Sequence, residues 1–129
     1  MAIAYNTITS AASSTAVTTL SVNHTAAGSN RLAVVICHLF RDPSDGVAIT
    51  SATYGGNAMT ERATIEWRGA TQNRTHRIYI YTYVAPPTSS TAVVWNSDNA
   101  AEASAIVVMS FTGVDQTDCQ RVGNHLRAI

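Results

Sequence analysis

The fold class of this chain is decided by residues 75–84, which have the sequence THRIYIYTYV. Aliphatic and aromatic residues alternate there with a period of two, which is the spacing of a β-strand. One face of this strand carries Ile78, Ile80 and Val84, and we expect it to lie in the core. The opposite face carries one arginine and three tyrosines, and we expect it to lie outside: Arg77, Tyr79, Tyr81 and Tyr83.

Seven further segments of strand-like composition surround this one. They are separated by turn residues such as Gly55-Gly56-Asn57 and comprise residues 3–9, 16–24, 31–40, 47–54, 59–67, 91–95 and 103–111. Residues 31–40 (RLAVVICHLF) are almost continuously apolar and predict a central strand. The pattern predicts an all-β, two-sheet antiparallel β-sandwich of about eight strands, jelly-roll-like, over residues 1–114. Residues 115–129 are expected to form a polar C-terminal tail or arm.

The composition of the 129 residues excludes several classes of protein. Hydrophobic residues make up 46% and charged residues 12%, with eight basic and eight acidic side chains. Because the hydrophobic content is high and the formal net charge is zero, we expect neither disorder nor a basic surface that binds nucleic acid. No apolar run approaches the roughly 18 residues of a membrane span, and no signal peptide is recognisable, so we expect no membrane partner and synthesis in the cytoplasm.

Candidate catalytic and metal-binding groups are few. None of His24, His38, His76 and His125 stand at the i, i+2 or i, i+4 spacing of a metal site, and three of them converge only if separate strands bring them together. Three close pairs of carboxylates occur in loops where turn formation explains them: Asp42 with Asp45, Asp98 with Glu102, and Asp115 with Asp118. The loop from Asp42 to Gly46 has too few ligands for a dedicated calcium site. We therefore predict no catalytic residues, no cofactor and no metal. We also expect the thiol of Cys37 to be buried and the thiol of Cys119 to be exposed.

The tyrosine face of residues 75–84 is the best candidate for a functional surface. Three explanations stay open for Arg77, Tyr79, Tyr81 and Tyr83. They can form the ordinary outer face of a sheet, a subunit interface, or a platform on which sugar rings stack. Both tryptophans, Trp67 and Trp95, stand among aliphatic residues on strands and are expected in the core.

Four phrases of the sequence resemble, in order and spacing, a family of β-sandwich proteins of tailed phages and prophages. The phrases are SNRL at 29–32, ATYGGNAMT at 52–60, YVAPPT at 83–88 and SFTGVDQ at 110–116. The resemblance covers roughly residues 15 to 117. It implies a virion surface component, such as a head decoration (cement) protein or a fibre module, and no catalytic residues.

The expected function is therefore that of a non-enzymatic phage structural protein on the capsid surface. Its partners would be the major capsid protein or another virion protein, together with further copies of itself in a dimer or trimer. The alternative is a carbohydrate-binding module of a phage fibre or receptor-binding protein, which would use the same tyrosines.

Overall fold

A computed structural model describes residues 2–42, 46–69 and 74–117 of the chain. These residues form nine strands and no helix. The strands are β1 (Ala4–Ser13), β2 (Val17–His24), β3 (Leu32–Arg41), β4 (Ile49–Tyr54), β5 (Asn57–Ala58), β6 (Thr60–Arg68), β7 (Thr75–Val84), β8 (Thr91–Ala101) and β9 (Ala103–Thr112).

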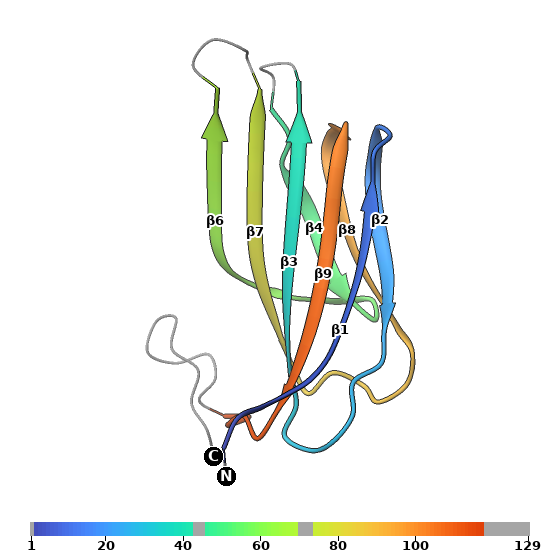
Figure 1. Cartoon of the computed structure of the whole chain (residues 1–129), viewed down its shortest axis with the longest axis vertical. Coiled ribbons are helices and arrows are strands. Elements are labelled where there is room, and N and C mark those ends of the chain that lie inside the picture. The colour runs from blue at the N-terminus through green and yellow to red at the C-terminus, as the bar shows by residue number, and fades with distance from the viewer. Residues whose placement is uncertain (1, 43–45, 70–73, 118–129) are drawn as a thin grey trace.

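The strands make two antiparallel sheets that pack face to face. The five-stranded sheet has the order β1-β9-β3-β7-β6, and the four-stranded sheet has the order β2-β8-β4-β5. In Figure 1 the five-stranded sheet lies in front, with β4, β8 and β2 behind it. Successive strands mostly alternate between the sheets, as in a jelly roll. The predicted all-β sandwich is confirmed.

The chain changes sheets between β5 and β6. A turn through Gly55 and Gly56, with φ angles of 58° and 84°, pairs β5 with the end of β4. Such positive φ angles suit glycine, which has no Cβ to clash. After Ala58 the chain crosses to the other sheet, where β6 pairs with β7. The sequence pattern predicted about eight strands, and the short β5 is the additional strand that it did not predict.

Strand β8 extends further than its sequence indicated. Residues 96–99 (NSDN), which predict a loop, continue the strand, and it ends at Ala101. The Asp98 side chain accepts hydrogen bonds from the backbone N–H groups of Ala48 (2.8 Å) and Asn99 (2.7 Å), and the pairing of β8 with β2 shifts register between Val17 and Thr19. The prediction was wrong because cross-strand partners satisfy polar groups that would otherwise favour a turn.

The main core lies between the two sheets. Alternate residues of β3 point into it, from Ala33 to Leu39, and fully buried Trp95 and Tyr54 come from the four-stranded sheet. Buried Cys37 belongs to this cluster, as predicted, and burial raises the pKa of its thiol to about 12. The predicted exposed thiol, Cys119, lies outside the described residues.

Candidate functional site

The tyrosine face of β7 points into the core, so its predicted exposure was wrong. Tyr79 and Tyr81 are only 4% and 5% exposed, whereas Ile78, expected in the core, is 38% exposed. Their neighbours on β3 are small or of medium size, with Tyr79 beside Cys37 and Tyr81 beside Val35. Because these β3 side chains leave space between the sheets, the large phenol rings fill it. Alternation alone defines two faces of a strand but does not say which one is buried.

Tyr83 and Arg77 lie at opposite ends of this inward face. The Tyr83 ring stacks on the buried Tyr54 ring, with centroids 4.9 Å apart and an angle of 3° between the planes. Arg77 forms an ion pair with Glu66 on β6 and donates a hydrogen bond to the Tyr79 hydroxyl at 3.3 Å. The four predicted residues therefore share one face, as expected, but this face is covered by the second sheet over most of its length.

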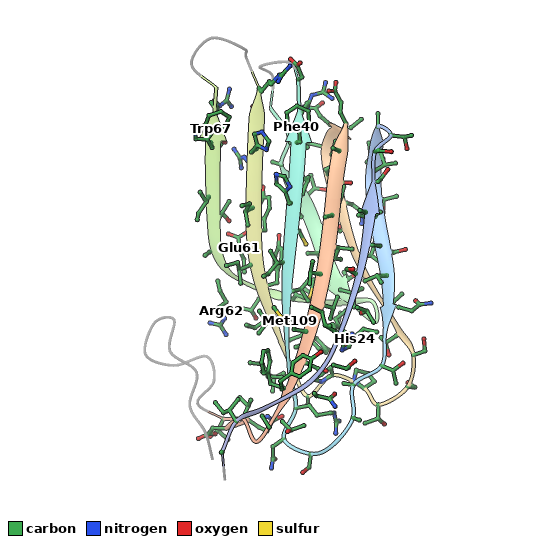
Figure 2. All side chains as sticks on the ribbon, in the orientation of Figure 1. His24, Phe40, Glu61, Arg62, Trp67 and Met109 are labelled. Carbon is green, nitrogen blue, oxygen red and sulfur yellow. The ribbon has the colours of Figure 1, made fainter. Side chains whose placement is uncertain are left out.

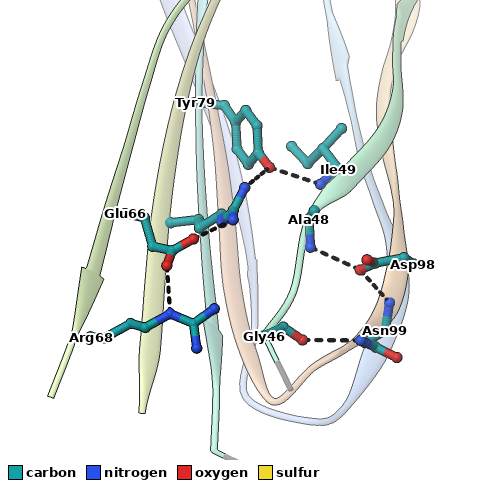
Figure 3. A network of polar contacts seen from close by, with 9 residues as sticks. Gly46, Ala48, Ile49, Glu66, Arg68, Tyr79, Asp98 and Asn99 are labelled. Atoms are coloured by element: carbon teal, nitrogen blue, oxygen red, sulfur yellow. Dashed lines mark hydrogen bonds and ion pairs between the residues drawn. The ribbon is translucent and has the colours of Figure 1, made fainter. Parts of the chain in front are cut away.

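The hydroxyl of Tyr79 joins the two sheets at one end of the sandwich (Figure 3). It accepts a hydrogen bond from the backbone N–H of Ile49 at 3.1 Å, on β4 of the other sheet. On the opposite side, Glu66 also accepts a hydrogen bond from Arg68 at 2.5 Å. This bond from Arg68, with the charge of Arg77, lowers the pKa of the Glu66 carboxyl, and the bond to Tyr79 raises the pKa of Arg77. The arrangement links β4, β6 and β7.

A groove of about 330 Å³ separates β4 from β6 and β7. It is lined by Ile49, Thr50, Ser51, Ala52, Thr53, Ala58, Met59, Glu61 and Tyr81. Its only ionisable side chains are the carboxyl of Glu61 and the phenol of Tyr81, whose pKa is raised by burial. Tyr81, one of the four predicted surface residues, thus borders this groove, with little of its side chain exposed.

The opposite face of the five-stranded sheet, here called the outer face, is apolar. It faces the viewer in Figure 2, with Trp67 and Phe40 at one end. Ile65 and Trp67 on β6 are 61% and 59% exposed, and Ile8 on β1 is 49% exposed. From the strand register, the outer face includes two polar residues, Ser10 and Thr82, and otherwise comprises Ala63, Ile65, Trp67, His76, Ile78, Ile80, Val34, Ile36, His38, Phe40, Ala103, Ala105, Val107, Met109, Ile8 and Ala12.

The register aligns these residues in rows across the sheet. Trp67 pairs with His76, His76 with Phe40, and Phe40 with Ala103. The next row runs from Ile65 through Ile78 and His38 to Ala105 on β9, and then to Ala12 on β1. In both rows the residue on β6, Trp67 or Ile65, is large and the residue on β9, Ala103 or Ala105, is small.

Two histidines lie next to each other on the outer face. His38 Nε2 and His76 Nδ1 are 3.0 Å apart, and the rings are stacked with an angle of 7° between their planes. The rings of Phe40 and Trp67 lie 4.8 and 5.5 Å from the His76 ring, centroid to centroid. Partial burial, together with the neighbouring His76, lowers the pKa of His38. The strand pairing has therefore brought together two of the histidines that the sequence keeps apart.

His24 is a third histidine with a different environment. It is fully buried where β2 meets β1 and β9, and its Nδ1 and Nε2 atoms lie 2.7 Å from Thr9 Oγ1 and 3.0 Å from Ser110 Oγ. Ser110 in turn donates to Asn6 Oδ1 at 2.9 Å. Because both ring nitrogens are engaged by neutral groups and no water reaches them, burial lowers the pKa of His24. This side chain stabilises the contact between the sheets.

The other predicted sites are distributed as follows. Within the part of the chain that the structure describes, no three His, Cys, Asp or Glu side chains come together as a metal-binding group. Asp115 accepts hydrogen bonds from the N–H and hydroxyl of Thr117, as expected of a turn residue. Asp42 lies 3.4 Å from Arg74, while its loop neighbour Asp45 lies outside the described residues.

The sequence analysis missed the outer face, although a signal for it was present. Residues 31–40 were recognised as almost continuously apolar, and 105–109 (AIVVM) show the same feature. A strand with apolar residues at every position is typical of sheets that are covered on both faces. Trp67 was also placed in the core, but on β6 it lies on the outer face, while Trp95 is buried as predicted.

A comparison of the chain with protein-family models, with curated proteins and with solved structures found no match in any of the three. Among residues 2–42, 46–69 and 74–117, no helix has the length and apolar character needed to cross a membrane.

Proposed function

We propose that this chain is a non-enzymatic structural protein of a tailed-phage virion, a decoration (cement) protein that stabilises the exterior of the head. Its partners are the major capsid protein and further copies of itself, and its place is the capsid surface. The proposal rests on the four phrases that resemble the phage β-sandwich family, and on the apolar outer face.

The exposed outer face is the observation that carries this proposal. Ile65, Trp67, Ile78 and Ile8 are each more than a third exposed on one continuous sheet surface. Exposed apolar patches of several hundred Å² mark sites of interaction, because burial of apolar surface contributes about 25 cal/mol per Å². A protein that repeats over a capsid also gains avidity from many equivalent contacts, so each contact can be modest.

The carbohydrate-binding alternative loses its expected platform. Sugar rings stack on exposed aromatic faces, whereas Tyr79 and Tyr81 are buried between the sheets and Tyr83 stacks on Tyr54. Sugar binding without particle binding would therefore count against the proposal in the functional test.

The test is co-sedimentation of the purified protein with particles of the phage or prophage that encodes it. We expect saturable binding at regularly repeated sites and a higher disruption temperature for decorated shells. Ile65→Lys should weaken both effects because it places a charge on the outer face. The matched control is Thr64→Lys, which alters the exposed neighbour on the opposite face of β6 and should bind normally. Binding to a glycan array without binding to particles would contradict the proposal.

A further inference from the structure

From the row of Trp67 and Ala103 to the row of Ala63 and Val107, the described residues of the outer face include no Lys, Arg, Asp or Glu, and the ionisable groups there are His38 and His76. Arg62 lies beyond these rows, where its Nε donates a hydrogen bond to Thr82 Oγ1 at 2.8 Å. A partner selected by charge would need complementary charges here. The whole chain has equal numbers of acidic and basic residues, so two copies do not repel each other strongly. The surface therefore suits a partner that is itself flat, apolar and uncharged.

The distribution of side-chain size suggests what that partner is. Bulky Trp67 and Ile65 stand on β6 at one side of the sheet, while small Ala103 and Ala105 occupy the same rows on β9. A twofold axis that runs between β7 and β3, parallel to the strands, brings β6 of one copy over β9 of the other. Trp67 then lies over Ala103 of the second copy, and Ile65 over Ala105. Large side chains of each copy therefore pack against small side chains of the other. This is the self-complementarity that a twofold interface requires.

We propose that the outer face binds a second copy of this chain, in a twofold dimer in which two five-stranded sheets pack face to face. This arrangement repeats between molecules the sheet-on-sheet packing already present within each one, at a separation of about 10 Å. It deepens the proposed function by naming the occupant of the outer face, and it rests on the role of that face in assembly.

The strands that overlap about this twofold axis set the size of the contact. Three strand spacings from β6 to β9 span about 14 Å, and six residues from His76 to Thr82 span about 20 Å, which gives a flat footprint on the order of 300 Å². Side-chain relief makes the accessible area larger, but a standard interface buries about 800 Å² per partner, so we expect a weak dimer. Aromatic Tyr5 and Phe111 extend the surface beyond this footprint, with ring centroids 6.4 Å apart.

The first test is the solution mass of the purified full chain, measured by sedimentation velocity from low to high micromolar concentration at neutral pH. We expect a dimer, and a dissociation constant raised about 100-fold or more by Ile65→Lys, because a charge would be buried without a partner. Thr64→Lys should leave the dimer intact. A wild-type monomer throughout this range, or an unchanged dimer for Ile65→Lys, would overturn the proposal.

A size exchange tests the geometry itself. Ala103→Trp alone should dissociate the dimer because two indoles would occupy one space. Trp67→Ala combined with Ala103→Trp should restore the dimer, since the large and the small side chain only exchange their positions. Circular dichroism of each variant verifies the strand content, and failure of the double variant to recover association would reject this pairing of β6 with β9.

These measurements use the protein without phage particles, so they separate the two proposals. A monomer that binds particles would refute the dimer and leave the decoration role standing. A dimer that binds no particles would support self-association and refute the decoration role.

Discussion

The two faces of the five-stranded sheet contain similar apolar residues but differ in what covers them. The inner face buries Val35, Cys37 and Leu39 of β3 completely, together with the phenol rings of β7. The outer face carries Ile36, His38 and Phe40 of the same strand, only partly buried by their neighbours. The chain therefore has apolar residues for two interfaces, but its own fold covers the inner face along its length and the outer face only at the end where Val114 packs against Leu32.

The largest effect should separate the two tryptophans. Trp95→Ala removes a fully buried indole from between the sheets and should lower the free energy of unfolding by about 3–5 kcal/mol. Trp67→Ala removes an indole that is 59% exposed and should cost about 1 kcal/mol or less, measured on the monomer at low concentration. Urea denaturation measures both values. Equal losses for the two variants would contradict the distinction between a covered inner face and an open outer face.

A smaller effect should distinguish two tyrosine hydroxyls of β7. Tyr79→Phe leaves the backbone N–H of Ile49 without an acceptor and leaves Arg77 with Glu66 alone, and it should cost about 1–2 kcal/mol. Tyr83→Phe removes only an exposed bond from Asn57 at 3.2 Å and should cost about 0.5 kcal/mol. The urea midpoints of the two variants give the comparison, and a larger loss for Tyr83→Phe would show that the inward link to β4 is unimportant.

Acid should weaken the inner contact through His24. Its pKa is lowered in the folded protein, so the unfolded chain binds a proton more readily once the pH falls below the ordinary value of 6.5. The stability is therefore fully present above that pH and decreases as the pH falls towards the folded pKa. Urea midpoints measured from neutral to acid pH should show this loss, and His24→Gln should show less of it. An identical pH profile for the variant would exclude His24 as the cause.

The smallest effect expected is on self-association through the outer face. The neighbours of His38 on this surface include no carboxylate. They are His76 and Ile78 of β7 and Ala105 of β9, and Trp67 of β6 lies against His76. Partial burial and the neighbouring His76 lower the pKa of His38, and its protonation would place a charge in the dimer interface, so association should weaken as the pH falls below the ordinary range of a histidine. Sedimentation measures the change, with His38→Asn as the uncharged control, and tighter association in acid would contradict the predicted arrangement.

Much of the fold could be predicted from local patterns. Alternation located β7, the apolar run located β3, and glycine turns separated most strands at nearly the observed bounds. The extension of β8 and the short β5 could not be found this way, because hydrogen bonds from β4 and β2 override the turn preference of Asn and Asp. For the site, the sequence grouped Arg77, Tyr79, Tyr81 and Tyr83 on one face correctly but assigned that face to the wrong side.

The sequence by itself determined that this chain forms a β-sandwich, because a period of two and β-branched residues depend only on neighbours along the strand. Only the tertiary structure decided which face of β7 became the core and which became a surface. That choice depends on which residues lie across the sheet and which sheet lies opposite. The contact of His38 with His76, 38 residues apart, and the size gradient from Trp67 to Ala103 arise from strand register, which no single strand encodes.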